Sequence, residues 1–267
     1  MRKCLLFLLA TNLMMLTVHS VTYNIRDVWF NNWAPWSYYT ANEVAVDFGN
    51  YYSYVSPTNK IQINNVGQLR FHMPQGKVGI FETGGSFLSR LTPKNAFNLE
   101  YRVKFDGGGG RDYDWTRGGK LPGLGGGVVY SGGNPATAGD GFSVRLQFSD
   151  GGSTGVPGQG YISPYVYYKD QPNQYGDGFG QYIPIADNVW NTIKVYVKVN
   201  TGSNANGVLA IYLNGALVFY KSDLRYVTNG TKVDMLYFSC FHGGTGAAWT
   251  PSQNQDVLFD NVMIRGF

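Results

Sequence analysis

The chain has 267 residues, with 21 lysines and arginines against 17 aspartates and glutamates, and its formal net charge is +4. Nucleic-acid-binding domains normally carry a much stronger basic stripe, so this composition does not predict a nucleic-acid partner. The 36 glycines, 20 tyrosines and 16 phenylalanines are typical of strands and turns and argue against a mainly helical protein.

Residues 1–20 have the composition of a cleaved signal peptide. Arg2 and Lys3 precede the largely apolar run Leu5–Leu16, and small or β-branched residues follow it. The run is well short of the ~20 residues that span a bilayer, so no membrane anchor is predicted. We expect a secreted, extracellular protein whose mature part, residues 21–267, forms one domain. Its net charge is +2, from 19 basic and 17 acidic residues.

Short segments that alternate apolar and polar residues follow, and they predict strands with one buried face. In chain order the clearest are Lys60–Ile63, Leu99–Phe105, Phe142–Phe148, Ile193–Val199 and Val208–Leu213. Asn214 and Gly215 separate two apolar runs, and both residues suit the positive φ of a type I′ hairpin turn. No helical periodicity, internal repeat or linker is visible. The sequence therefore predicts an all-β, single-domain β-sandwich of the jelly-roll type.

Segment 117–124 reads Arg-Gly-Gly-Lys-Leu-Pro-Gly-Leu, and its glycines and proline predict a stiff turn with Lys120 at its head. Loops on rigid scaffolds often carry functional side chains, although a lone lysine in such a segment is more commonly solvated. The glycine-dense stretch 107–139 is too long for a plain hairpin turn and predicts loops over a cleft.

Alternation places three polar side chains on one face of the predicted strand Phe142–Phe148: Ser143, Arg145 and Gln147. For this strand taken alone, a solvent-exposed arginine is the favoured interpretation. Tyr165 and Tyr167 share a face of another alternating segment, where an aromatic ladder or a core phenol is the commoner outcome.

Other kinds of active site find little support. Glycosidases usually need two positioned carboxyl groups, yet the mature chain has three scattered glutamates: Glu43, Glu82 and Glu100. The segment Asp112-Tyr113-Asp114 is the nearest approach to a pair and predicts a solvated loop or a cation site. His72 and His242 lack the spacing of metal ligands, so neither a metal nor another cofactor is predicted.

Cys240 is the only cysteine after residue 20, which excludes an intramolecular disulfide in the mature chain. It lies in an apolar run and is expected to behave as a small buried hydrophobe. Asn229 begins the sequon Asn-Gly-Thr, which predicts a glycosylation site and agrees with a secretory route.

Three motifs follow one another along the chain: Gly118–Leu124, Phe142–Arg145 and Tyr165–Tyr167. In this order they resemble polysaccharide lyase family 14, which comprises alginate lyases of marine molluscs and glucuronate-specific lyases of chlorella viruses. The likeness covers roughly residues 95–264 and continues through Trp190–Ile193, Asn206–Leu209, Phe241–Gly244, Trp249–Pro251 and Phe259–Asn261. His242 stands where an aromatic residue would be expected.

The resemblance implies a jelly-roll lyase whose active-site residues fall on Lys120, Ser143, Arg145, Tyr165 and Tyr167. Tyr168 is an alternative position for the tyrosines. Substrate-binding roles are predicted for Arg117, Ser143 and Gln147.

Lyases of this kind cut a 4-linked uronate polymer by β-elimination, in which the C5 proton is removed and the C4 oxygen leaves. Arg145 suits neutralisation of the C6 carboxylate, because its planar fork matches a carboxylate and stays charged. A tyrosine whose phenolate is stabilised by Lys120 and Arg145 is predicted to act as base and acid. Lys120 is either a second catalytic group or an electrostatic one.

We therefore expect a monomeric, endolytic lyase that acts on an anionic polysaccharide, foremost mannuronate-rich alginate, without a cofactor. A glucuronan (β-1,4-glucuronate) lyase is the alternative enzyme, since the two sugars differ only at C2. A non-catalytic carbohydrate-binding lectin is the alternative from another class, because one jelly-roll fold hosts many functions.

Overall fold

The computed structural model describes residues 23–49, 51–56 and 59–267. The predicted signal peptide, residues 1–20, lies outside these described residues. One sheet contains β1 (Tyr23–Val28), β3 (Ile61–Ile63), β4 (Leu69–Met73), β6 (Ala96–Asp106), β11 (Asn191–Lys198), β12 (Gly207–Leu213), β13 (Ala216–Leu224) and β15 (Gln255–Gly266). The other contains β2 (Tyr51–Val55), β5 (Gly85–Lys94), β7 (Gly119–Gly127), β8 (Gly141–Ser149), β9 (Gly160–Tyr167), β10 (Ile183–Ile185) and β14 (Val233–His242).

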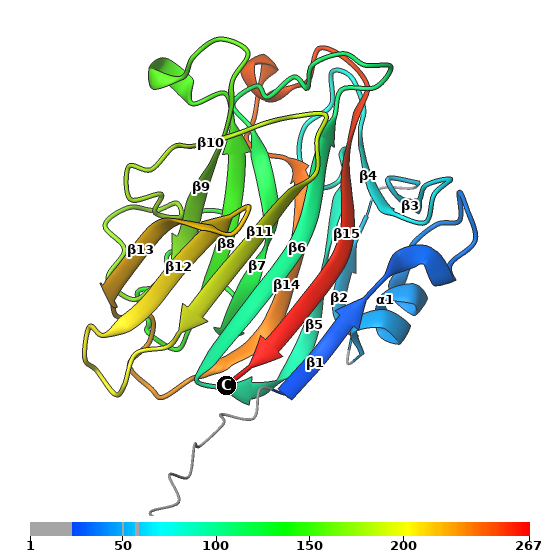
Figure 1. The fold of residues 1–267 in the computed structure, drawn as a ribbon. Coiled ribbons are helices and arrows are strands. Elements are labelled where there is room, and N and C mark those ends of the chain that lie inside the picture. Colours follow the sequence, from blue (N-terminus) through cyan, green and yellow to red (C-terminus); the bar gives the residue numbers. More distant parts are fainter. Residues whose placement is uncertain (1–22, 50, 57–58) are drawn as a thin grey trace, which may run out of the picture.

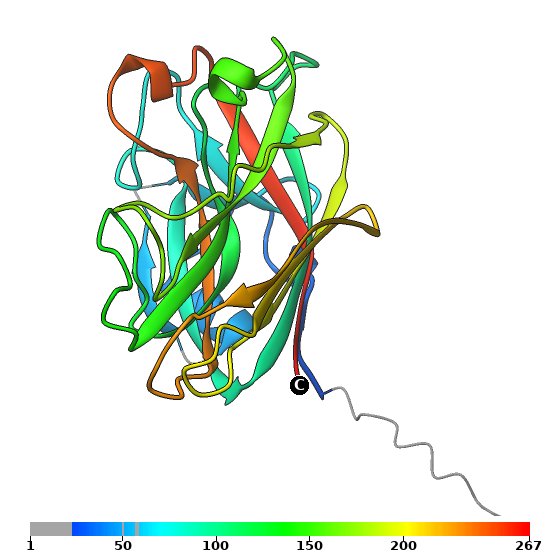
Figure 2. The same cartoon turned by 90° about the vertical axis from the view of Figure 1, so that its left-hand side faces the viewer.

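The two sheets face one another as the layers of a sandwich (Figures 1 and 2). The eight-stranded sheet has the order β13-β12-β11-β6-β15-β4-β3, with β1 paired to β15, and the seven-stranded sheet has the order β10-β9-β8-β7-β14-β5-β2. Neighbouring strands are antiparallel, and non-consecutive strands lie side by side, as β7 and β14 do. The predicted all-β sandwich is confirmed.

The five predicted strands correspond to β3, β6, β8, β11 and β12. The hairpin between β12 and β13 turns at Asn214 and Gly215, whose φ angles are 50° and 85°. Both lie in the left-handed region that a type I′ turn requires, so the predicted hairpin is confirmed.

Aromatic side chains fill the space between the sheets, and Phe238 lies at the centre of one group. Its ring stacks on Phe87 at 4.7 Å and contacts Phe259 edge-on at 5.0 Å. Each such pair contributes about 0.5–1.5 kcal/mol beyond the area it buries. Since the inward side chains of the seven-stranded sheet form the core, its outer face is available for a site.

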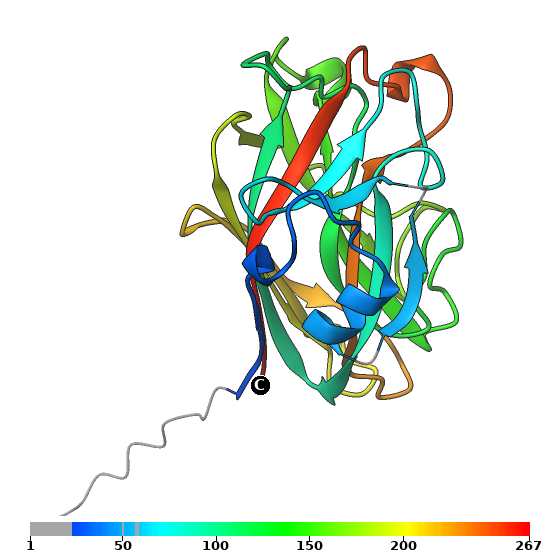
Figure 3. The ribbon, with the colours of Figure 1, turned by 90° about the vertical axis from the view of Figure 1, so that its right-hand side faces the viewer.

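One helix was not predicted, namely α1 (Ala41–Phe48), which packs against β1, β2 and β5 (Figure 3). Its start is fixed by a capping box, in which Thr40 Oγ1 accepts from a helix N–H and Glu43 Oε2 accepts from the Thr40 N–H at 2.7 Å. Val44 and Phe48 are buried one turn apart. The short helices are η1 (Phe30–Asn32), η2 (Gly152–Thr154) and η3 (Ala247–Trp249).

Candidate active site

Lys120 lies near the start of β7, a central strand of the seven-stranded sheet, and not on the turn that segment 117–124 predicted. That prediction was wrong because Pro122 and the glycine after it form a bulge inside the strand. The pairing of β7 with β8 shifts between Leu121 and Leu124. A proline is accepted within a sheet at a bulge, where its missing N–H is not needed, and a bulge also re-aims neighbouring side chains.

Strand register brings the predicted residues together on the outer face of β7, β8 and β9. Lys120 is opposite Gln147, and Arg145 is opposite Tyr165. The Lys120 Nζ donates to Gln147 Oε1 at 3.3 Å and lies 3.5 Å from the centroid of the Tyr165 ring. Side chains from three separate motifs thus form one group.

The side chain of Arg145 is almost fully buried, with 2% of the residue exposed, in contrast to the solvated arginine that its strand alone favoured. Its guanidinium carbon lies 4.4 Å from the centroid of Tyr237 and 5.4 Å from that of Tyr165. In the part of the chain that the structure describes, its Nε has no hydrogen-bond partner. Within the described part of the chain, neither Arg145 nor Lys120 forms an ion pair with a carboxylate. A buried cation such as Arg145 that lacks a counter-ion favours the binding of an anion.

Tyr165 and Tyr167 point to the same side of β9, as the alternation predicted. Their rings meet edge to face with centroids 5.6 Å apart, and their hydroxyl oxygens are 3.4 Å apart. Tyr165 is partly exposed, whereas Tyr167 is fully buried and its oxygen accepts from the Gly133 N–H at 3.1 Å. The two phenols are therefore not equivalent, because Tyr167 lies behind Tyr165.

Tyr168 and Ser143 do not join this group. Tyr168 belongs to the core, packs against Phe179 and donates to Asp177 Oδ2 at 3.0 Å. The Ser143 hydroxyl is buried and donates to the carbonyl of Tyr130 at 2.6 Å. Neither side chain presents a free polar group to the cations.

The cations and Tyr165 line a cleft of about 680 Å³ on the seven-stranded sheet. Its other walls are Ile80, Ser131, Gly132, Gln147, Tyr175, Tyr237, Phe241, Gly243, Gly244, Thr245 and Trp249. Tyr237 was not predicted as a site residue, although the alternation of its strand indicates that it faces away from the core. In the run 235–241 it alternates with Leu236 and Phe238, which face the core.

Arg117 lies beside this cleft, in a second hollow of about 640 Å³. The hollow and the cleft share Gln147 and Trp249, so together they form one longer groove. Arg117 is exposed, and in the residues that the structure describes its guanidinium forms no ion pair. A smaller hollow of about 330 Å³ near Trp115 contains none of the predicted catalytic or substrate-binding residues.

The comparison with known families agrees with this geometry. The model of the family described as Polysaccharide lyase 14 matches residues 62–262, which include all the side chains above. The chain belongs to polysaccharide lyase family 14. It is therefore a polysaccharide lyase, as the three motifs predicted.

Solved structures similar to this family 14 lyase include alginate lyase Aly36B, with 29% identity and a TM-score of 0.78 over 91% of this chain and 96% of that one. A variant of that enzyme with a lysine and a tyrosine replaced by alanine, in complex with alginate tetrasaccharide, has 28% identity and a TM-score of 0.79, with the same coverage. The marine alginate lyase of this family from Aplysia kurodai shares the fold at 22% identity and a TM-score of 0.68, over 91% of this chain and 98% of that one. A search of curated proteins gave no match.

Proton affinities in the site of this lyase are shifted in opposite directions. Burial and the nearby Arg145 guanidinium hold the pKa of Lys120 well below its usual value. Burial disfavours any charged amine, and the positive charge of Arg145 repels a second one. Burial and the hydroxyl of Tyr167 raise the pKa of Tyr165, and Arg145 only partly opposes them. The free lyase therefore favours a neutral amine on Lys120 more than an exposed lysine would, and it keeps Tyr165 as a phenol.

Behind the cleft of the lyase, His242 is buried and links β14 to two neighbouring segments. Its Nε2 accepts from Gln255 Nε2 at 3.1 Å, and its Nδ1 lies 3.2 Å from Thr116 Oγ1. The acceptor role of Nε2 places the proton of the neutral ring on Nδ1. Burial lowers the pKa of His242 to about 4, although Asp114 acts in the opposite direction.

The remaining polar candidates of the lyase make structural contacts. Asp114 Oδ2 accepts from the Ser252 N–H at 2.6 Å, and His72 pairs with Asp256 on the other sheet. No cluster of three metal-ligating side chains occurs in residues 23–49, 51–56 and 59–267. Cys240 is buried, as expected. The described helices include none long and apolar enough to cross a membrane.

Proposed function

We propose that this lyase is a secreted, endolytic enzyme that cleaves mannuronate-rich alginate by β-elimination. The observation that carries the proposal is the pair of basic side chains, Lys120 and Arg145, which share a cleft with Tyr165 and pair with no carboxylate among the residues that the structure describes. A uronate residue supplies the missing carboxylate together with the C5 proton that must be removed and a leaving oxygen at C4.

Arg145 binds and neutralises the C6 carboxylate. The C5 proton is a poor acid until the negative charge of the enolate-like transition state is stabilised by preorganised donors. Arg145 is suited to this because its guanidinium contacts two tyrosine rings and its Nε has no hydrogen-bond partner among the described residues. A guanidinium also matches the planar carboxylate better than an ammonium group would.

Lys120 and Tyr165 divide the proton transfers. The sequence-based hypothesis gave both steps to a tyrosine, but the pKa of Tyr165 is raised and that of Lys120 is lowered. Neutral Lys120 therefore accepts the C5 proton, the electrons form the C4=C5 double bond, and Tyr165 gives its proton to the departing C4 oxygen. Proton exchange between the two groups and solvent then restores the starting state.

The position of both groups on one side of the cleft favours a sugar whose C5 hydrogen and C4 oxygen lie on one face of the ring. Mannuronate and glucuronate have this arrangement, whereas guluronate, inverted at C5, requires groups on opposite faces. Mannuronate is proposed because a relative at 28% identity binds alginate tetrasaccharide when a lysine and a tyrosine are replaced. Glucuronan is the runner-up substrate.

Endolytic action is supported by the open groove that continues past the cleft. The cleft and the hollow that holds Arg117 meet at Gln147 and Trp249, so a chain can extend through both. We propose that Arg117 binds the carboxylate of a further uronate residue. A monomer suffices, since every proposed catalytic side chain comes from one sheet of one chain.

Secretion is proposed from residues 1–20, and it agrees with the place of the sequon. Asn229 is exposed in the segment between β13 and β14, outside both strands. Expression in a secreting eukaryotic host should give a protein that starts at Val21 and carries a glycan on Asn229. N-terminal sequencing and glycosidase treatment measure both.

The substrate is tested with purified polymannuronate, polyguluronate and glucuronan, by the ultraviolet absorbance of the conjugated double bond. Polymannuronate should give the fastest rise, and a rapid fall in viscosity should mark internal cleavage. Lys120→Ala should abolish the rise, whereas Lys104→Ala, on the opposite sheet and paired with Asp106, should not. Saturable polymer binding without new absorbance would support the lectin alternative instead.

A further inference from the structure

The side chain of Gln171 joins the two loops that wall the cleft beside the tyrosine pair. It lies just beyond β9 and is 7% exposed. One loop, residues 131–139, supplies Ser131 and Gly132 to the cleft, and the other, residues 168–177, supplies Tyr175. A buried amide that satisfies all its hydrogen bonds in two loops fixes their relative position.

All four hydrogen bonds of this amide go to backbone groups of these loops. Gln171 Oε1 accepts from the N–H groups of Ala136 and Tyr168, each at 3.2 Å. Its Nε2 donates to the carbonyls of Asn173 at 2.7 Å and Tyr175 at 3.3 Å. The carbonyl oxygen therefore holds the first loop, and the amide nitrogen shapes the second.

The first loop in turn touches the catalytic group through Gly133. Its N–H donates to the Tyr167 oxygen at 3.1 Å, and the Tyr167 hydroxyl lies 3.4 Å from that of Tyr165. Gly133 has a φ of 84°, and a Cβ there would lie 3.1 Å from the ring of Tyr175. Only glycine fits this contact between the loops without strain.

The hydrogen bond from the Gly133 N–H to the Tyr167 oxygen has a chemical consequence. Because the Tyr167 oxygen already accepts the Gly133 N–H, the Tyr167 proton is free to point toward Tyr165. When Tyr165 loses its proton, the Tyr167 hydroxyl can donate to the new phenolate, and the Gly133 N–H stabilises the charge that spreads to Tyr167. Two consecutive hydrogen bonds thus connect Gly133 to Tyr167 and Tyr167 to Tyr165.

We propose that Gln171 is a positioning residue for catalysis, which keeps the Gly133 N–H aimed at Tyr167 and so supports the phenolate of Tyr165. The role in catalysis rests on the lyase function proposed above. The placement of the Gly133 N–H by Gln171 does not depend on that function.

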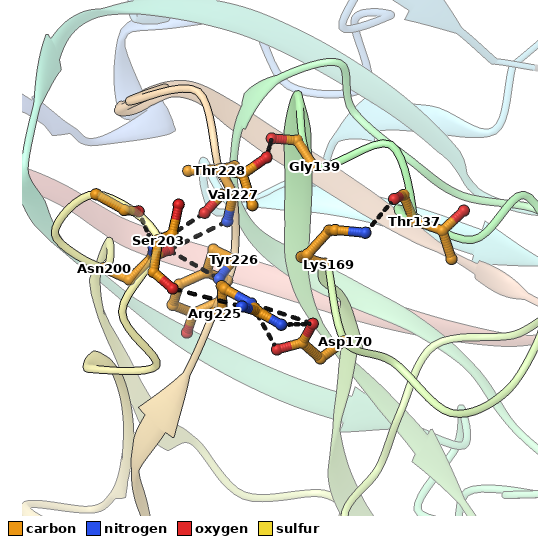
Figure 4. A network of polar contacts seen from close by, with 11 residues as sticks. Thr137, Gly139, Lys169, Asp170, Asn200, Ser203, Arg225, Tyr226, Val227 and Thr228 are labelled. Atoms are coloured by element: carbon orange, nitrogen blue, oxygen red, sulfur yellow. Dashed lines mark hydrogen bonds and ion pairs between the residues drawn. The ribbon is translucent and has the colours of Figure 1, made fainter.

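Contacts that do not involve Gln171 hold the far end of the first loop. The positioning role of Gln171 can therefore be distinguished from a role in folding. Lys169 Nζ donates to the carbonyl of Thr137 at 2.6 Å, and the Thr228 N–H donates to that of Gly139 at 2.8 Å (Figure 4). Arg225 and Asp170 form an ion pair beside them at 2.7 Å. Loss of Gln171 thus frees mainly residues 131–136, next to the cleft.

The test compares Gln171→Met, which keeps the size and removes the hydrogen bonds, with Gln171→Glu, which keeps the acceptor of the Ala136 N–H. We expect Gln171→Met to lower kcat about 10- to 100-fold with little change in KM, since a donor to developing charge is lost. Gln171→Glu should keep more of the activity. The matched control is Asn64→Leu, which removes a buried amide in the turn between β3 and β4 of the other sheet and should leave kcat within about twofold.

Hydrogen exchange at the Gly133 amide, followed by NMR, gives a readout that needs no activity. Exchange should be slow in the wild type and at least about tenfold faster in both Gln171→Met and Tyr167→Phe. Unchanged exchange in Gln171→Met, or a kcat like that of the wild type, overturns the proposal. If the wild type cleaves no uronan, the proposed function fails, and the exchange data still decide whether Gln171 positions Gly133.

Discussion

Lys120→Met should make the protein more stable while abolishing its activity. Methionine fills nearly the same space with a flexible apolar chain, and it removes an amine whose charged form burial and Arg145 both disfavour. Functional sites often hold such unfavourable arrangements, so their removal raises stability at the expense of function.

The magnitude follows from the positions of the two charges. Lys120 Nζ is 3.5 Å and the Arg145 guanidinium carbon 5.4 Å from the same ring centroid, that of Tyr165. Their separation is therefore at most about 9 Å, so the repulsion in the charged form of Lys120 is at least about 2 kcal/mol at an effective dielectric constant of about 20. The variant loses a cation–π contact and a hydrogen bond, each worth about 0.5–1 kcal/mol, but it also loses the desolvation penalty of the ammonium group. We expect a net gain of about 1 kcal/mol, or roughly 2–4 °C in Tm.

The pH dependence provides an independent check of the cause. Because the folded protein holds the pKa of Lys120 below its unfolded value, the unfolded chain binds more protons, and the stability of the wild type rises with pH across that window. The advantage of Lys120→Met in urea unfolding should therefore shrink as pH rises from the lowered pKa of Lys120 toward the ordinary lysine value. Lys194→Met, whose lysine lies 4.1 Å from the Tyr212 ring on the other sheet, should give no gain. A lower Tm for Lys120→Met, or a gain that does not change with pH, would refute the reasoning.

Three further predictions concern Tyr165, Arg117 and the histidine behind the cleft. Tyr165→Phe should lower kcat at least about 100-fold, because the group that protonates the C4 oxygen is lost. Tyr168→Phe, on the core side, should keep a kcat within about twofold of the wild type. Equal losses of kcat in the two variants would contradict the assignment of Tyr165 as the acid. Arg117→Ala should raise KM for the polymer about tenfold and lengthen the final products, since one carboxylate contact is lost; an unchanged KM and product pattern would remove Arg117 from the substrate path. Because the pKa of His242 is about 4 in the folded protein, against an ordinary histidine value of 6.5, stability should fall by up to about 3 kcal/mol as pH drops between these values. His242→Gln should lose this slope in urea titrations, and an unchanged slope would assign it to other groups.

The parts of the fold that depend on local pattern could be predicted from the sequence. Alternation found β8 and the shared face of Tyr165 and Tyr167, because side chains on a strand repeat every two residues. The same local pattern led to the wrong prediction that Lys120 lies on a turn. A proline flanked by glycines is compatible with a turn and with a bulge inside a strand, and the sequence does not distinguish them. It also missed α1, although Thr40 and Glu43 have the spacing of a capping box.

Burial of the site depends on contacts between distant segments and could not be predicted in this way. Arg145 is covered in part by Tyr237, which lies on β14 and reaches it only because β14 pairs with β7. The hydrogen bonds of Gln171 likewise link two loops whose pattern is irregular. No periodicity indicates such contacts, and the motifs located the site only because their order resembled a family.

Mass spectrometry of the products from purified polymannuronate tests the central claim most directly. Elimination at the Lys120, Arg145 and Tyr165 cleft predicts oligosaccharides lighter by one water than the corresponding hydrolysis products, with the absorbance of a C4=C5 double bond. Products of hydrolysis mass, or intact polymer that binds saturably and is never cut, would contradict the account.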